Sequence, residues 1–248
     1  MGRSVTPSTA DAGPAGASAA GSSGPSSAPW IDPADLRVGI LGGTFDPIHY
    51  GHLAIAEQVR EALRLDRVLF VPAARPPHKL DEVLTAVADR AAMVELAVAD
   101  NAAFVMSGIE LSRDGPSYTV DTLAELAGEA TRQRVDRTLY FILSVEALGT
   151  LSTWHEPARL LELARLAVVE RPGSPLPDAA RVGAMLPGGA ASVDRVERVD
   201  TVPLANSSSD VRARAATGRS IRYLVPPAVE AYIRDHRLYR SNKPRRTA

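Results

Sequence analysis

The stretch GILGGTFDPIHYGHL, Gly39–Leu53, decides the fold of this chain. It begins inside a short apolar run, Val38–Leu41, which predicts a buried strand. Gly42 and Gly43 follow directly, and two glycines permit backbone angles and close approaches that side chains would block. A helical pattern then covers about residues 49–63. The stretch therefore predicts a strand, a tight turn and a helix whose N-terminus points back over the turn.

Two histidines lie on the first turn of this predicted helix. His49 and His52 are three residues apart, so they share one helical face. A helix N-terminus carries free N–H groups and partial positive charge, which suit a phosphate. The pair could clamp phosphate oxygens, or both side chains could simply be solvated. The glycine spacing fits neither the dinucleotide fingerprint nor the P-loop.

Length and composition restrict the function to local sites. The chain has 248 residues, enough for one α/β domain with a sizeable core or for two small domains. A formal net charge of −1 gives no overall field toward nucleic acid or membranes. The absence of cysteine excludes disulfides and thiol chemistry and is compatible with a reducing cytoplasm, the location we expect. No apolar run approaches the ~20 residues of a membrane span.

The chain divides into three parts by composition. Of residues 1–29, 25 are Ala, Gly, Ser, Thr or Pro, so we expect residues 1–34 to be a disordered tail. A misassigned start codon is an alternative, and no apolar segment typical of a signal peptide is present. Residues 35–240 should form the folded domain. Residues 241–248 form a basic tail.

Apolar runs and helical patterns alternate along the expected domain. Strands are predicted at residues 38–41, 68–71, 104–109, 139–143, 166–170 and within 193–202, and helices at 49–63, 85–99, 119–129, 157–164, 206–218 and 227–235. This alternation predicts an α/β fold, a Rossmann-like doubly wound parallel sheet. Because the loops after the strands meet at one edge of such a sheet, we expect the ligands to bind there.

Taken whole, GGTFDPIHYGHL resembles the signature of adenylyltransferases with a His-x-Gly-His motif. Among these it is most similar to the bacterial nicotinate mononucleotide adenylyltransferases. The resemblance covers about residues 36–240 and includes the closing pattern from Tyr223 to Tyr239. It implies the nucleotidyltransferase type of Rossmann-like sheet. It also implies adenylyl transfer from ATP to nicotinate mononucleotide, which gives deamido-NAD and pyrophosphate in NAD biosynthesis.

Two further motifs of the family follow the next strands. The family's Pro-Pro-His-Lys loop is present at residues 76–79, so the resemblance implies that Lys79 faces the phosphates, whereas spacing alone favours a solvated basic loop. In the segment SYTVDTL, residues 117–123, the resemblance implies a pocket for the pyridine ring and its carboxylate. Ser117 or Thr119 could instead cap the helix that begins there.

The later motifs include departures from the family pattern. Ser144 and Glu146 stand where the family usually has Gly and Asp, which puts the nucleotide contacts in doubt. Trp154 follows a strand end in a polar loop, where a flat ring could stack on a pyridine, although tryptophan is more often a core residue. In the segment NSSSDVR, residues 206–212, hydroxyl groups and an arginine could hold phosphate, or could cap a helix. Asn206 replaces the isoleucine of the family motif.

Together, the residues and the family resemblance imply three sets of site residues. The catalytic candidates are His49, His52, Lys79 and Arg212. The ATP-binding candidates are Gly42, Gly43, Thr44, Phe45, His49, His52, Ser144, Glu146, Ser207, Ser208, Ser209 and Arg212. The candidates for binding the pyridine mononucleotide are Thr44, Lys79, Tyr118, Thr119, Trp154, His155 and Arg171. Mg²⁺ should accompany ATP, held mainly by phosphates and water, so no protein metal site is predicted.

Three other functions remain open at this point. A phosphopantetheine adenylyltransferase would share the first and last motifs but lacks the SYTxDTL and tryptophan features. An enzyme that prefers the amide mononucleotide differs from the main prediction by one carboxylate contact. Ser144 and Glu146 also suit a nucleotide-binding regulator that has lost turnover. The partners expected are ATP and nicotinate mononucleotide, without nucleic acid or membrane, and the sequence sets no oligomeric state.

Overall fold

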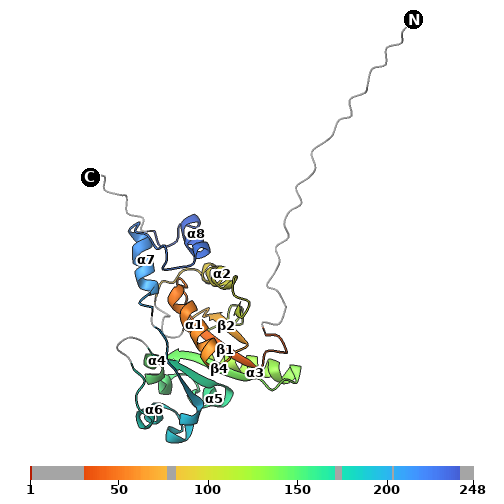
Figure 1. Cartoon of the computed structure of the whole chain (residues 1–248), viewed down its shortest axis with the longest axis vertical. Coiled ribbons are helices and arrows are strands. Elements are labelled where there is room, and N and C mark those ends of the chain that lie inside the picture. Colours follow the sequence, from red (N-terminus) through yellow and green to blue (C-terminus); the bar gives the residue numbers. More distant parts are fainter. Residues whose placement is uncertain (2–30, 77–81, 171–174, 203, 241–248) are drawn as a thin grey trace.

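The structure is a computed structural model that describes residues 1, 31–76, 82–170, 175–202 and 204–240. The apolar runs of the sequence form a six-stranded sheet (Figure 1). Its strands are β1 (Arg37–Gly43), β2 (Arg67–Pro72), β3 (Phe104–Met106), β4 (Thr138–Ser144), β5 (Arg165–Val169) and β6 (Val196–Val199). All pair in parallel, in the order β3-β2-β1-β4-β5-β6. The predicted doubly wound parallel sheet is confirmed.

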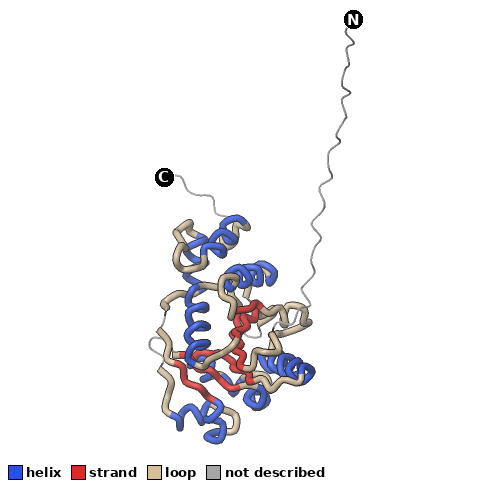
Figure 2. The backbone as a smooth tube through the Cα atoms, turned by 45° about the vertical axis from the view of Figure 1, so that its right-hand side comes forward, coloured by secondary structure: helices blue, strands red, loops and turns tan. Residues whose placement is uncertain are grey.

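The winding direction reverses in the middle of the sheet. From β1 the chain moves outward through β2 to β3, and then returns to place β4 on the other side of β1. The connections that leave β1 and β4 therefore diverge, and a crevice forms outside their carboxyl ends. In Figure 2 the strands lie at the centre of the domain with helices around them.

Helices cover both faces of the sheet. They are α1 (Tyr50–Ala62), α2 (Val87–Val98), α3 (Thr119–Gln133), α4 (Val145–Gly149), α5 (Pro157–Leu163), α6 (Ala179–Met185), α7 (Ser208–Ala216) and α8 (Pro227–Asp235), with the 3-10 helices η2 (Leu151–Thr153) and η3 (Gly189–Arg195). One core lies between the sheet and α1, α2 and α8, and the second lies between the sheet and α3 and α5.

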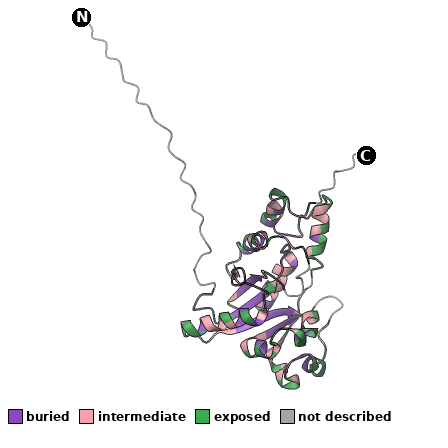
Figure 3. Ribbon diagram, turned by 180° about the vertical axis from the view of Figure 1, so that it is seen from behind, coloured by how far each residue is buried: buried purple, intermediate pink, exposed green. Residues whose placement is uncertain are grey.

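Strand side chains alternate between these two cores. In β2, Val68 and Phe70 belong to the first core, and Leu69 and Val71 to the second. A strand that is buried on both faces is apolar at every position, which is why the sequence shows continuous runs. Figure 3 shows the buried residues concentrated in the strands and the inner faces of the helices.

The predicted bounds hold within a few residues, with one clear exception. The strand expected over residues 104–109 ends at Met106. Ser107 N still donates to Phe70 O, but the chain then turns, and Leu111 N donates to Gly108 O. The turn at Gly108 ends the strand pairing, although the loose alternation of apolar residues in the sequence predicted that the strand would continue. Upstream of β1, Ile31 is already fully buried in the second core. Among the described residues, no helix combines the length and apolar character needed to cross a bilayer.

Candidate active site

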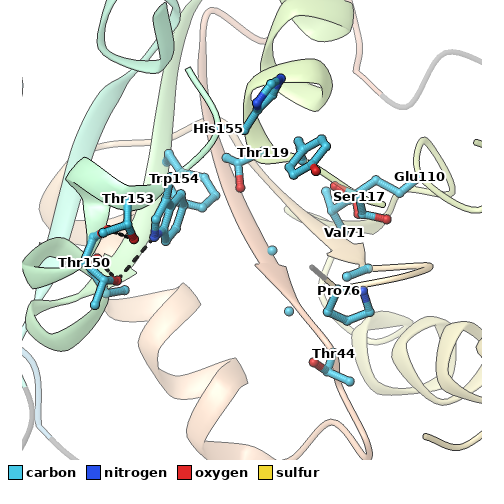
Figure 4. A pocket seen from close by; sticks show the side chains of 16 residues that line it. Thr44, Val71, Pro76, Glu110, Ser117, Thr119, Thr150, Thr153, Trp154 and His155 are labelled. Carbon is cyan, nitrogen blue, oxygen red and sulfur yellow. Dashed lines mark hydrogen bonds between the residues drawn. The ribbon is translucent and has the colours of Figure 1, made fainter. Parts of the chain in front are cut away.

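A cavity of about 660 Å³ opens at the carboxyl ends of β1 and β4, where the sheet reverses its winding (Figure 4). Strand ends, the loop after β2, the start of α3 and the segment around η2 form its wall. The lining residues are Gly42, Gly43, Thr44, Val71, Ala73, Pro76, Glu110, Ser117, Tyr118, Thr119, Phe141, Ala147, Thr150, Thr153, Trp154 and His155. The predicted ligand edge of the sheet thus carries a cavity.

One of the two glycines of the turn, Gly43, is needed for space. Neither Gly42 nor Gly43 has a positive φ, so backbone angle is not the reason for them. A Cβ on Gly43 would lie 3.1 Å from the ring of Phe45, whereas one on Gly42 would make only ordinary contact with Phe141. Phe45 itself has φ +49° and is 2% exposed. Its ring therefore packs against the turn at Gly43 and does not line the cavity.

The two histidines meet at the N-terminus of α1. His49 is the N-cap residue, and its backbone N–H donates to His52 Nδ1 at 3.3 Å. Their rings stack with centroids 3.8 Å apart, and the ring of Phe45 meets His52 edge-on at 5.0 Å. A Cβ on Gly51 would lie 3.0 Å from the His49 ring. The glycine of the His-x-Gly-His motif thus makes room for the first histidine.

Helix α7 brings its N-terminus to the same turn. Ser207 caps the helix by accepting from Asp210 N at 3.1 Å, so the capping interpretation of this segment is confirmed. Ser208 Oγ donates to Pro47 O at 2.9 Å. Arg212 donates to Asp46 O at 2.6 Å and to Ser209 Oγ at 3.3 Å. Two helix N-termini therefore converge beside the histidine pair.

Asn206, which the family pattern left unexplained, ties α7 to α1 through a shared acceptor. Its Nδ2 donates to Leu224 O at 3.3 Å, and the same carbonyl accepts from Tyr50 N at 3.0 Å. An isoleucine could not donate this bond. The replacement therefore supports the junction of the two helix starts.

Aromatic side chains line the part of the cavity that is formed by the segment after η2 and the start of α3. Trp154 packs edge-on against Phe141, with centroids 5.9 Å apart, and its Nε1 donates to Thr150 Oγ1 at 3.3 Å. The rings of Tyr118 and His155 lie 4.4 Å apart at an angle of 32°. These contacts fix flat surfaces on which a ring could stack.

The structure gives Ser144 a local role. It is the N-cap of α4, and its Oγ accepts from Ala147 N at 3.3 Å. A glycine at this position would offer no side-chain acceptor. Glu146 lies in the first turn of α4, where a negative charge is favourable. Neither residue is among those that line the cavity.

A buried arginine holds the loops together beneath the site. Arg90, on α2, is 1% exposed, and its guanidinium donates to four carbonyl oxygens. The acceptors are Thr44 O (2.7 Å), Ala73 O (2.8 Å), Ala74 O (3.3 Å) and Thr85 O (3.0 Å). Burial lowers its pKa, but an arginine remains charged. Arg90 therefore joins the turn after β1 to the loop after β2.

Asp46, in the turn after β1, is held by hydrogen bonds from two distant segments of the chain. Its carboxylate accepts from Tyr239 Oη at 2.7 Å and from Thr85 N at 3.2 Å. Burial raises the pKa of Tyr239 far above its usual value, and Asp46 raises it further. The phenol is thus held protonated as a hydrogen-bond donor.

The start of α3 differs from the capping prediction. Its N-cap is Tyr118, without a side-chain cap, so neither Ser117 nor Thr119 caps the helix. Ser117 instead accepts from Arg75 N at 3.2 Å. Burial raises the pKa of the neighbouring Glu110, although the hydrogen bond from Thr122 Oγ1 lowers it in part.

The predicted site residues fall into two adjoining groups. Lining the cavity are Gly42, Gly43, Thr44, Tyr118, Thr119, Trp154 and His155. Around the turn after β1 lie Phe45, His49, His52, Ser207, Ser208, Ser209 and Arg212. Ser144 and Glu146 lie at α4, next to Ala147. Lys79 and Arg171 lie outside the described residues.

Sequence reasoning missed Arg90, Glu110, Phe141, Thr150 and Thr153. One signal existed for Glu110, because an acid stands between Ile109 and Leu111. In the part of the chain that the structure describes, no cluster of three or more His, Cys, Asp or Glu side chains could hold a metal.

Comparison with known proteins identifies relatives. The cytidylyltransferase-like family model matches residues 40–214. A probable nicotinate-nucleotide adenylyltransferase of Thermomicrobium roseum is 47% identical over 205 residues, which cover 83% of this chain and 92% of the relative. A protein of the same name from a Roseiflexus species is 49% identical over 203 residues, covering 82% and 98%.

A solved structure also has the same fold. The Plasmodium falciparum nicotinic acid mononucleotide adenylyltransferase complexed with NaAD superimposes with a TM-score of 0.67. The match covers 82% of this chain and 97% of that chain, at 19% identity. At this identity the match shows the shared fold alone.

Proposed function

Because the chain belongs to the nicotinate-nucleotide adenylyltransferases within the cytidylyltransferase-like family, we propose that it adenylylates nicotinate mononucleotide. The products are deamido-NAD and pyrophosphate, a step of NAD biosynthesis. The observation that carries the proposal is the convergence of two helix N-termini, two histidines and an arginine beside a cavity with aromatic walls. The helix N-termini, the histidines and the arginine suit phosphates, and the aromatic walls suit a nucleotide ring. A cytoplasmic location belongs to the same proposal.

The reaction is an in-line displacement at phosphorus. A phosphate oxygen of nicotinate mononucleotide forms a bond to the α-phosphorus of ATP, and the bond from that phosphorus to the bridging oxygen of pyrophosphate breaks. The attacking phosphate is already an anion, so the protein need supply neither a nucleophile nor a general base. Catalysis then consists of positioning and of stabilising charge on oxygen.

We assign the charge-stabilising work to His49, His52, Lys79 and Arg212. The stacked histidines share the N-terminus of α1, and Arg212 lies one turn into α7. Gly42, Gly43 and Thr44 would pass beneath the phosphates, with Ser208 and Ser209 beside them. Each charge-assisted hydrogen bond of this kind can contribute a few kcal/mol in the transition state.

The acceptor mononucleotide would occupy the aromatic part of the cavity. Trp154 would stack on the pyridine ring, and the N–H groups at the start of α3, around Tyr118 and Thr119, would receive its carboxylate. His155 belongs to this wall, and Arg171 is a further candidate from the sequence.

Mg²⁺ would accompany ATP and neutralise phosphate charge when bound. It prefers phosphate oxygens and water, which suits a site without a dedicated protein cage. Asp46, the carboxylate of the turn, is already engaged by Tyr239 and Thr85. We therefore assign no side chain as a metal ligand.

The deciding experiment is pyrophosphate release from ATP and Mg²⁺ with three acceptors in parallel. These are nicotinate mononucleotide, nicotinamide mononucleotide and phosphopantetheine. We expect fast release with the first. Preferred release with another acceptor would keep the chemistry but replace the substrate. Folded protein that binds ATP but releases no pyrophosphate with any acceptor would favour the alternative function, a nucleotide-binding regulator that has lost turnover.

A further inference from the structure

Tyr239 reaches the turn after β1 from the segment that follows helix α8. Its hydroxyl donates to Asp46 Oδ1 at 2.7 Å, although the two residues are 193 positions apart in the sequence. Its backbone has φ +61°, which a bulky residue rarely adopts, and its side chain packs against the first core. Because such a conformation is costly, it persists only where the surrounding contacts enforce it. The fold therefore places this hydroxyl at the turn.

Asp46 accepts a hydrogen bond at each of its three oxygen atoms. Tyr239 Oη is the donor to Oδ1, and Thr85 N donates to Oδ2 at 3.2 Å. The backbone carbonyl oxygen accepts from Arg212 Nη1 at 2.6 Å. Because Asp46 is only 4% exposed, water cannot readily replace a donor that is lost. The donors to the carboxylate therefore restrain the orientation of the residue, and with it the carbonyl that binds Arg212.

Without the hydroxyl of Tyr239, the carboxylate of Asp46 and the guanidinium of Arg212 would be drawn together. A buried carboxylate that lacks a donor attracts another one, and a cation already lies on the carbonyl of the same residue. Arg212 would then exchange a neutral acceptor for an ionic one. With the hydroxyl in place, Arg212 binds the carbonyl and Ser209 Oγ, and its other N–H groups can serve phosphate.

We propose that Tyr239 is a positioning residue for ATP: by holding the carboxylate of Asp46, it keeps the guanidinium of Arg212 directed at the phosphates. The proposal rests on the proposed function, in which Arg212 stabilises phosphate charge. Tyr239 is not among the residues that line the cavity, so it acts through the turn and not by contact with a substrate. Its effect should therefore fall on ATP and not on the mononucleotide, whose ring is assigned to the wall at Trp154.

A Tyr239→Phe substitution removes the hydroxyl and keeps the ring in the core. We expect the calorimetric Kd for ATP to rise about fivefold, the size of effect that one lost hydrogen bond produces. We expect kcat to fall about tenfold, because a misplaced guanidinium stabilises less charge in the transition state. The Kd for nicotinate mononucleotide should stay within about twofold.

Tyr232→Phe is the matched control. Tyr232 belongs to α8, and its hydroxyl donates to a carboxylate at a similar distance, Asp89 Oδ1 at 2.8 Å, but Asp89 lies on α2 and not in the turn. This variant should keep both Kd values and kcat within about twofold of the wild type. If either variant is partly unfolded, the rise of its Tm with ATP concentration still gives the Kd, because ATP binds the folded protein.

The Arg212→Met background separates positioning from a purely structural role. No guanidinium remains there to be misplaced, so adding Tyr239→Phe should change the Kd for ATP and kcat by less than about twofold. A hydroxyl that only stabilised the fold would give the same fold-change with and without Arg212.

Selective weakening of ATP by Tyr239→Phe, with no further loss in the Arg212→Met background, would support the proposal. Unchanged affinity for ATP, equal weakening of nicotinate mononucleotide, or the same effect from Tyr232→Phe would overturn it. Turnover of the wild type tests the proposed function separately. If the wild type bound ATP but released no pyrophosphate, the Kd values for ATP would still decide the role of Tyr239.

Discussion

Arg212 Nη1 donates a 2.6 Å hydrogen bond to the carbonyl oxygen of Asp46, which attaches helix α7 to the turn after β1. With the bond to Ser209 Oγ, this uses two of the five N–H groups of the guanidinium. A planar fork can hold the turn with one edge and present another edge to phosphate oxygens. The residue can therefore position the site and also stabilise charge in it.

An Arg212→Lys variant should separate these geometric demands from charge alone. An ammonium group keeps the charge but cannot reproduce the fork, so we expect kcat to fall by about 10²-fold. Arg214→Lys is the control, because Arg214 lies on the same helix and forms an exposed pair with Asp210. Steady-state kinetics measure both. Equal kcat values for the two variants would rule out a role for the guanidinium of Arg212.

Two substitutions at His52 should distinguish catalysis from helix capping. Its Nδ1 accepts from His49 N, the arrangement in which Gln also serves at the third helical position. We expect His52→Gln to lose about 10²-fold in kcat with little change in unfolding free energy. His52→Ala should lose similar activity and, in addition, about 1 kcal/mol of stability. Near-wild-type turnover in the Gln variant would remove His52 from the mechanism.

Replacing Arg90 should cost more stability than replacing any exposed arginine. Arg90→Met removes the donor from four carbonyl oxygens, and buried acceptors left without a partner cost about 1–3 kcal/mol each. We therefore expect the free energy of unfolding to fall by about 3 kcal/mol or more. Arg181→Met, at an exposed position of α6, should change it by less than about 0.5 kcal/mol. Denaturant unfolding of both variants makes the comparison.

The raised pKa of Tyr239 predicts a loss of stability in alkali. An unfolded tyrosine ionises near pH 10, whereas burial and Asp46 keep the folded phenol protonated. The stabilisation is complete below the unfolded pKa and is lost as the pH rises above it. Between pH 9 and 11 the unfolding free energy of the wild type should fall more steeply than that of Tyr239→Phe. Parallel pH curves for the two proteins would contradict this assignment.

Most of the fold could be predicted because its signals are local. Strands that are buried on both faces give continuous apolar runs. The glycine turn after β1 and the start of the next helix depend on residues that are adjacent in the sequence. The strand from Phe104 was predicted too long because Ser107 and Gly108 allow a turn that alternation does not reveal. For the start of α7 the sequence left helix capping and phosphate binding open, and the structure shows that Ser207 caps the helix.

The supporting polar groups could not be predicted in the same way. The partners of Arg90 are backbone carbonyls from separate loops, and sequence shows no pattern for carbonyls that only the tertiary fold brings together. Ser117 shows the same limit, because its hydroxyl serves Arg75, 42 residues away, and not the helix beside it. The roles of His49, His52 and Lys79 in catalysis stay predictions.

The bond from Arg90 to Thr44 O has a consequence for protein engineering, since its partners are 46 residues apart. A peptide that spans β1 and α1 would contain every letter of the motif and yet lack the cation that restrains its turn. Transplanting the motif into another scaffold would therefore require a second insertion that supplies this guanidinium from an adjacent helix. The transferable unit is a pair of segments.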